Sequence, residues 1–216
     1  MAFDAKLLCP LCGERQSQHT GYRYISREHI PPQSIFVDKT DDLITVPSCK
    51  ECNHGTKDFD EKFKAILGLY FGYERPALWN SVRGTVRKNQ KMGRSFLENT
   101  SVHLAPYGQG EMGHPAKIEA VPVNIVVKKI VRGLHWHVTK NVLPPTAQIT
   151  VVLVEQRNEL SPDVKAIFER FGRWLESGGG CFQAQYAIVE DQSSSIWRLR
   201  FYDEDFCTAY VEPPEG

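Results

Sequence analysis

The stretch "CKECN", residues 49–53, decides how the first third of the chain folds, because its two cysteines have a matching pair upstream. That pair lies in "CPLC", residues 9–12, so the chain carries two C-x-x-C motifs. Each motif presents two thiolates from a tight turn, which is a common half-site for tetrahedral zinc, and two half-sites leave no open position for chemistry. We therefore predict one structural zinc ion, bound by Cys9, Cys12, Cys49 and Cys52.

The segment between the two motifs, residues 13–48, is longer than the insert of a plain zinc ribbon. The pattern predicts strands at residues 22–25 and 42–47 and a helix at 58–71. A module of about 75 residues has a small core and usually needs a metal or disulfides to fold. The binding energy of zinc would therefore be folding energy for this part of the chain.

Inside that segment, "EHIPPQS" places Glu28 and His29 side by side, and after Ile30 a rigid Pro31-Pro32 pair follows them. Together with the two cysteine pairs and with Asn53 directly after the second pair, this arrangement resembles the HNH endonuclease family. The resemblance covers residues 7–72. It implies a ββα fold that holds one catalytic divalent ion, with two flanking zinc knuckles as in many members. The activity that it implies is metal-dependent hydrolysis of DNA phosphodiester bonds.

The resemblance also implies a role for each matching residue. His29 matches the general base that activates water, and histidine can accept a proton at neutral pH. Glu28 matches the acidic ligand of the catalytic ion, and Asn53 matches the last motif position, where the side chain also ligates the ion. Lys57 matches a position that histidine or lysine occupies in the family. Carboxylate and amide oxygens suit Mg²⁺ or Mn²⁺.

The chain departs from the family pattern in ways that keep other hypotheses open. The middle asparagine of the motif would fall just before Leu43, where this chain has Asp41-Asp42. Glu28 is one methylene longer than the usual aspartate, and His54 is an alternative ligand beside Asn53. The alternatives are a catalytically inactive, zinc-stabilised module that binds nucleic acid or protein, and an interaction protein whose zinc only stabilises the fold.

The charge of the chain sums to zero but is unevenly distributed. Residues 75–94 contain basic side chains and no acidic one, and a helix expected at residues 77–97 covers most of this stretch. Such a helix directly after the motif is expected to contact the DNA backbone, although a solvated basic helix would look the same. The candidate DNA-binding residues are Arg75, Arg83, Arg87, Lys88, Lys91 and Arg94.

The rest of the sequence is typical of a compact α+β unit that matches no family known to us. After a linker rich in Gly and Pro, the patterns alternate between strands and helices, and the four tryptophans are expected to be core residues. The expected strands are 117–123, 148–155, 181–190, 196–203 and 206–211, and the expected helices are 124–139 and 161–177.

The predicted fold class is therefore α+β. A small zinc-stapled ββα-metal, treble-clef-like module at the N-terminus precedes a C-terminal α+β domain with a mainly antiparallel sheet. The expected divisions are a nuclease-like module at 1–74, a basic helical connector at 75–104, a linker at 105–115 and an accessory domain at 116–216.

The expected compartment and partners follow from the ends and the composition. No apolar run approaches the ~20 residues that span a bilayer. The first residues lack the pattern of a secretion signal, so a reducing, cytoplasmic location is expected, where cysteines more often bind metals than form disulfides. The expected partner is DNA, with no membrane, and residues 116–216 are candidates for a homodimer or protein contact.

Overall fold

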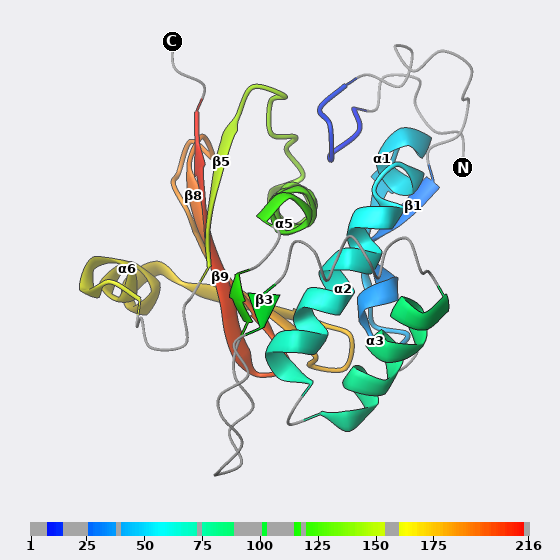
Figure 1. Ribbon diagram of the computed structural model, residues 1–216. Coiled ribbons are helices and arrows are strands. Elements are labelled where there is room, and N and C mark those ends of the chain that lie inside the picture. Colours follow the sequence, from blue (N-terminus) through cyan, green and yellow to red (C-terminus); the bar gives the residue numbers. More distant parts are fainter. Residues whose placement is uncertain are drawn as a thin grey trace. The chain divides into compact units, whose positions relative to one another are not determined.

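The computed structural model describes residues 8–14, 26–37, 40–72, 75–88, 101–102, 115–117, 120–153 and 160–213 (Figure 1). By their contacts these residues fall into two compact units. The first unit combines residues 1–33, 39–55 and 127–216, and the second combines 34–38 and 56–126. The contacts thus group the N-terminal motif with the C-terminal sheet, whereas the sequence predicts a boundary at residue 74. A two-stranded hairpin is marginal by itself, and here it packs within the larger unit.

The hairpin of the first unit is antiparallel. It consists of β1 (Ser26–Ile30) and β2 (Ile44–Ser48), with His29 opposite Thr45. A short helix, α1 (Lys50–His54), follows β2 directly. The strand expected at residues 42–47 is confirmed within two residues.

Glu28 and His29 lie inside β1. The sequence had instead placed them after a strand. The strand expected at residues 22–25 lies outside the described residues. Successive side chains of a strand point to opposite faces. Buried Glu28 therefore shares a face with buried Ile30, and half-buried His29 lies on the other face.

A five-stranded sheet forms the C-terminal part of the first unit, in the order β5-β9-β8-β7-β6. Every pairing in it is antiparallel, which confirms the expected sheet type. Its strands are β5 (Gln148–Leu153), β6 (Arg173–Ser177), β7 (Phe182–Ile188), β8 (Ser195–Phe201) and β9 (Glu204–Glu212). On one face, apolar side chains of the three central strands are buried, among them Phe182, Trp197 and Ala209.

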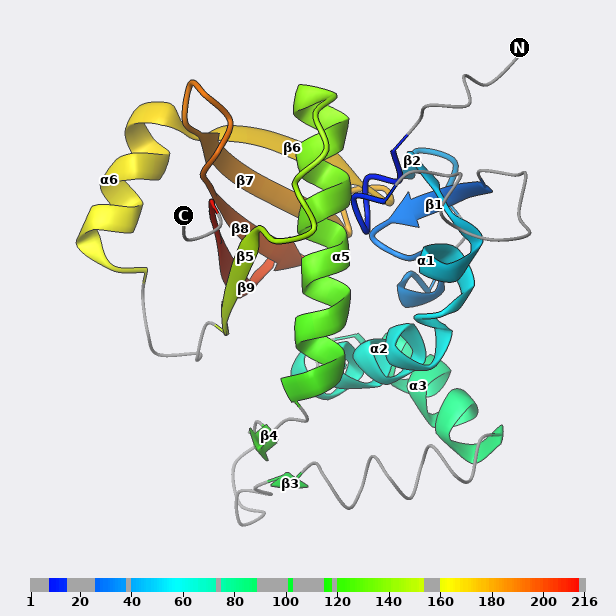
Figure 2. The ribbon, with the colours of Figure 1, turned by 90° about the horizontal axis from the view of Figure 1, so that it is seen from above.

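Helix α5 (Ala120–Thr139) packs on that face with its second half, between the sheet and the β1–β2 hairpin (Figure 2). The strand expected at residues 117–123 is wrong from residue 120 onward. Pro122 sits in the first turn of α5, where its missing N–H is not needed. The apolar spacing that continues from Val123 is helical, and four side chains from residue 127 onward are fully buried: Val127, Ile130, Val131 and Leu134.

Helix α6 (Pro162–Phe171) begins as predicted, with the Ser161 Oγ accepting the Val164 N–H at 3.3 Å. Its expected end at residue 177 is wrong. Gly172 is extended, and the chain continues as β6 paired with β7. A Cβ at Gly172 would lie 2.3 Å from the Phe168 carbonyl oxygen, so the close approach there requires glycine. Figure 1 shows α6 on the face of the sheet opposite to α5.

The second unit contains α2 (Lys57–Phe71) and α3 (Pro76–Lys88), which pack together. Both helices were expected, although residues 89–97 of the basic helix lie outside the described residues. The contact is close at Gly68, where a Cβ would lie 2.3 Å from Val82 Cγ2. The short strands β3 (Ser101–Val102) and β4 (Pro115–Lys117) pair with each other, and a 3-10 turn, η2 (Gln33–Ile35), follows β1. Within the described part of the chain, no helix is long and apolar enough to cross a membrane.

Candidate functional site

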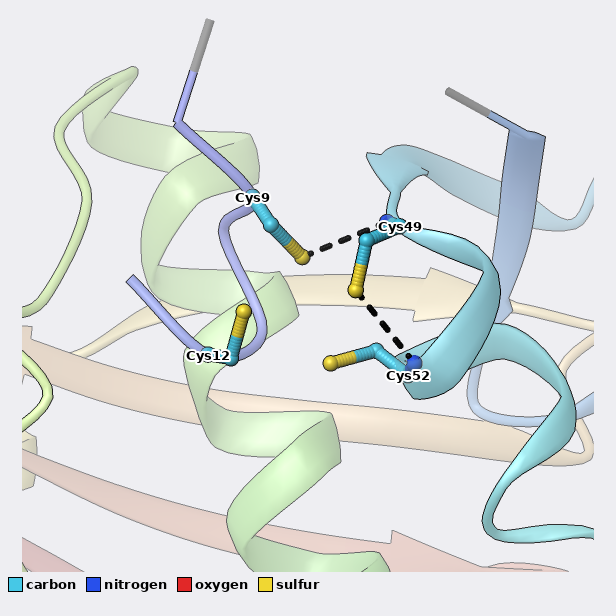
Figure 3. Close-up of side chains that lie close together, drawn as sticks. All are labelled: Cys9, Cys12, Cys49 and Cys52. Atoms are coloured by element: carbon cyan, nitrogen blue, oxygen red, sulfur yellow. Dashed lines mark hydrogen bonds between the residues drawn. The ribbon is translucent and has the colours of Figure 1, made fainter. Parts of the chain in front are cut away.

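The four cysteines predicted to bind zinc come together in the first unit (Figure 3). One pair lies in the turn before β1, and the other pair lies at the start of α1. Their Sγ atoms all lie within 4.8 Å of one another. Four thiols at this spacing are the donor set of a closed tetrahedral zinc site, so the chain could hold a structural zinc ion here.

Backbone groups orient these sulfur atoms. The Cys49 N–H donates to the Cys9 Sγ, and the Cys52 N–H donates to the Cys49 Sγ, both at 3.4 Å. Cys49 is also the N-cap of α1, so the start of the helix and the second knuckle are the same structure. Hydrogen bonds of this kind hold metal ligands in place.

The first knuckle rests on the loop after α5. Gly13 has a positive φ of 75°, and a Cβ there would lie 2.8 Å from Pro145 Cδ. Arg132 on α5 holds that loop by donating to the carbonyl oxygens of Leu143 and Pro144, both at 3.1 Å, and of Pro145 at 3.3 Å. The metal site is therefore built on residues far downstream in the sequence.

The four thiols differ in how readily they ionise. Hydrogen bonds from Cys12 and Cys52 lower the pKa of the Cys9 thiol. Burial raises the pKa of Cys49 to about 12, and hydrogen bonding with Cys12 raises the pKa of Cys52. Four thiolates so close together need a compensating cation, and a bound zinc ion deprotonates its thiol ligands.

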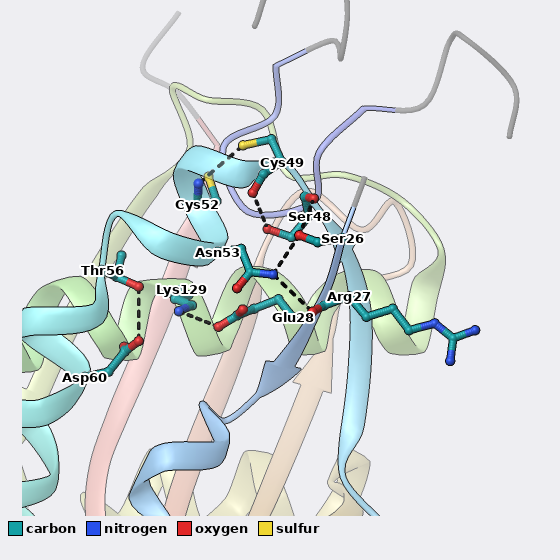
Figure 4. Close-up of polar contacts among 10 residues, drawn as sticks. All are labelled: Ser26, Arg27, Glu28, Ser48, Cys49, Cys52, Asn53, Thr56, Asp60 and Lys129. Carbon is teal, nitrogen blue, oxygen red and sulfur yellow. Dashed lines mark hydrogen bonds and ion pairs between the residues drawn. The ribbon is translucent and has the colours of Figure 1, made fainter. Parts of the chain in front are cut away.

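Glu28, expected to ligate a divalent ion, is paired with a lysine of α5 (Figure 4). Lys129 Nζ lies 2.6 Å from Glu28 Oε1, and the two side chains are 5% and 8% exposed. Among the described residues, Glu28 belongs to no group of three or more His, Cys, Asp or Glu side chains that could hold a metal; the four cysteines do. The carboxylate assigned to the catalytic ion is thus already neutralised by an internal cation.

Asn53, the other expected ligand, anchors α1 to β1 (Figure 4). Its Nδ2 donates to the Ser26 Oγ at 2.6 Å and to the Arg27 carbonyl oxygen at 3.1 Å. Ser26 and Glu28 share one face of β1, so Asn53 lies on the same side of the strand as Glu28. Both predicted ligands are brought to one side of β1, and Lys129 supplies the positive charge there.

The remaining predicted site residues are more dispersed. Because His29 lies on the other face of β1, it does not share the Glu28 side of the strand. Asp42, a candidate support for His29, accepts the Gly179 N–H with both carboxylate oxygens at 3.0 and 2.9 Å. This bond lowers the pKa of Asp42 and assigns the side chain to the turn between β6 and β7. Asp41 and His54 are exposed, and Lys57 is an exposed residue at the start of α2.

The candidate DNA-binding residues are described in part. Arg83 and Arg87 lie one turn apart on α3 and are exposed, opposite the side that buries Leu78 and Val82. Arg75 precedes α3 and is half-buried. Lys88 ends α3, and Lys91 and Arg94 lie outside the described residues.

Sequence reasoning missed several residues that matter here. Lys129 is buried within an apolar run of α5, "IVVKKIV", and a charged residue inside such a run was the signal that the sequence offered.

Trp174, expected in the core, is 51% exposed, and the guanidinium carbons of Arg198 and Arg200 lie 6.0 and 5.9 Å from its ring centre. Trp197 is fully buried, as expected.

Comparison with protein-family models, with curated proteins and with solved structures finds no match for this chain.

Proposed function

We propose that the chain is a zinc-stabilised endonuclease of the HNH type that hydrolyses DNA phosphodiester bonds. One observation carries this proposal: the clustered cysteines lie on both sides of the hairpin that carries Glu28 and His29, and Asn53 lies in the helix that begins at the second pair. These are the residues that resemble the HNH motif in the sequence. The two hydrogen bonds from Asn53 Nδ2 to β1 support it, because they join the helix to the strand that carries the histidine.

In this proposal His29 is the general base that takes a proton from the attacking water. It is half-buried, and its strand is fixed by β2 on one side and by Asn53 on the other. Glu28 and Asn53 would hold a divalent ion, Mg²⁺ or Mn²⁺, whose chemistry is to stabilise negative charge on the phosphate and leaving oxygen. Exposed Arg83 and Arg87 would contact backbone phosphates, which makes binding salt-dependent without specifying sequence.

A nicking assay on supercoiled plasmid, with Mg²⁺ or Mn²⁺ present, tests the proposal. His29→Ala should lower the cleavage rate by about 10²–10⁴-fold, the usual contribution of a general base. The zinc content and the far-UV circular dichroism should not change. His137→Ala, which removes another half-buried imidazole, is the matched control and should cut at the parent rate. Equal rates for parent and His29→Ala would remove His29 from the chemistry.

A second candidate function has its own supporting observation, the Glu28–Lys129 pair. A carboxylate with an internal counter-ion suits a module that has kept the zinc scaffold and binds nucleic acid without cutting it. Such a protein would shift DNA or RNA in a gel at low salt and leave it whole with every divalent ion tried. Residues 116–216 would then be the proposed site of a homodimer or protein contact.

A further inference from the structure

A buried lysine stands beside the carboxylate that the proposed function assigns to a divalent ion. Lys129 Nζ lies 2.6 Å from Glu28 Oε1, with the two side chains 5% and 8% exposed. Lysine is rarely buried to this degree unless it is paired. The cation beside Glu28 is therefore part of the protein itself.

The packing of α5 on β1 fixes where this ammonium group lies. Four residues after Lys129, a Cβ at Gly133 would lie 2.6 Å from Cγ1 and 2.7 Å from Cδ1 of Ile30, so the helix backbone closely approaches the strand. Residues four apart share a helix face, and residues two apart share a strand face. Lys129 on Glu28 and Gly133 on Ile30 are therefore successive steps of one contact. The backbone of α5 cannot shift far from β1 while this contact persists, so Lys129 can leave Glu28 only by a movement of its own side chain.

The same side of β1 also carries the second predicted ligand. Asn53 Nδ2 is bound to Ser26 Oγ and the Arg27 carbonyl oxygen, which leaves its Oδ1 as the atom with the chemistry to ligate a cation. A carboxylate and an amide oxygen are hard donors, and an ammonium group beside them repels any second cation.

We propose that Lys129 is a built-in counter-ion that must leave Glu28 before a divalent cation binds there, so that this lysine sets the metal affinity of the site. The inference rests on the proposed function, since it takes Glu28 as a metal ligand. With Lys129 in place, the carboxylate charge is already compensated and a divalent ion binds weakly. Without that charge, the buried carboxylate needs a cation, and a divalent ion supplies it.

Mn²⁺ binding to the zinc-loaded full chain tests this inference. Free Mn²⁺ is measured by electron paramagnetic resonance, and zinc stays in the cysteine site because thiolates bind zinc far more tightly than manganese. Lys129→Met and Lys129→Gln both remove the charge, and the second keeps a neutral hydrogen-bond donor for Glu28 in case the first does not fold. Either variant should bind one Mn²⁺ at least about tenfold more tightly than the parent, which corresponds to ~1.4 kcal/mol.

Two controls define the site. Lys128→Met removes the exposed neighbouring charge of α5 and should bind Mn²⁺ as weakly as the parent. Glu28→Gln in the Lys129→Gln background should lose the added affinity. Equal Mn²⁺ affinity in the parent and the folded Lys129 variants overturns the inference, and so does tighter binding that survives Glu28→Gln. Cleavage is scored separately, so a variant that gains Mn²⁺ but leaves DNA whole supports this inference and counts against the proposed nuclease.

Discussion

The Glu28–Lys129 pair gives a stability prediction that requires neither zinc nor DNA. The charged atoms are 2.6 Å apart, and less than a tenth of each side chain is exposed. Removing one partner of a buried pair leaves an uncompensated charge and typically costs ~3–5 kcal/mol. Lys129→Met should therefore lower the free energy of unfolding by about 3–5 kcal/mol, which corresponds to a fall in Tm of roughly 10 °C for a chain of this length.

Urea unfolding of four proteins measures this effect: the parent, Glu28→Gln, Lys129→Met and the double variant. In the double variant neither buried charge remains, so its loss should be smaller than the sum of the two single losses by at least about 1 kcal/mol. Lys128→Met, on the exposed side of α5, should stay within ~0.5 kcal/mol of the parent. Single losses that add within ~0.5 kcal/mol would refute the reasoning, because independent sites behave in this way.

Three further predictions concern the rest of the first unit. Cys49→Ser should abolish the binding of one zinc per chain and lower the unfolding free energy by at least ~3 kcal/mol, which is part of what a structural zinc contributes. Cys181→Ser is the control and should keep the zinc. Metal analysis and thermal melting measure both effects, and a parent protein without zinc whose Tm equals that of Cys49→Ser would contradict the prediction. Gly133→Ala should lower the free energy of unfolding in urea by about 1–3 kcal/mol, because the added methyl group clashes with Ile30. In an Ile30→Ala background the same substitution should not carry this cost. A Gly133→Ala variant more stable than the parent would show that α5 does not lie so close to β1. Burial, with Arg132 nearby, lowers the pKa of His135 to about 4. The unfolded chain therefore takes up a proton at this histidine before the folded chain does, and the free energy of unfolding should fall by about 2 kcal/mol as the pH drops from 6.5 to 4. Unfolding measured against pH should show this loss in the parent and not in His135→Gln.

The features that the sequence predicts correctly are those with a local cause. Two C-x-x-C turns need little more than their own spacing to present paired thiols, so the cysteine cluster is readable from the sequence. Helix α6 starts where Ser161 and Pro162 indicate, because a cap and a fixed φ act within one turn.

The features that sequence reasoning missed depend on partners far along the chain. The apolar spacing of α6 continues past Gly172, but the chain is extended there and continues as β6, whose partner β7 lies later in the sequence. From its own segment Glu28 is predicted to be a metal ligand, whereas its partner Lys129 comes from α5, about a hundred residues later in the sequence. From its own segment Asp42 is a candidate support for His29, whereas its partner Gly179 lies in the turn between β6 and β7.

These long-range partners bear on how far the N-terminal motif can act alone. The Ile44 N–H at the start of β2 donates to the Ser177 Oγ at 3.0 Å, and Asp42 binds the Gly179 N–H next to it. A fragment that ends at residue 74 would leave Glu28 without its lysine and the first strand residue of β2 without its hydroxyl acceptor. The same fragment would expose Ile30, which is fully buried in the whole chain and lies against Gly133 of α5, and exposing an apolar side chain to water is unfavourable. The C-terminal sheet and α5 therefore act as part of the scaffold of the motif, and the proposed cutting or binding should require both.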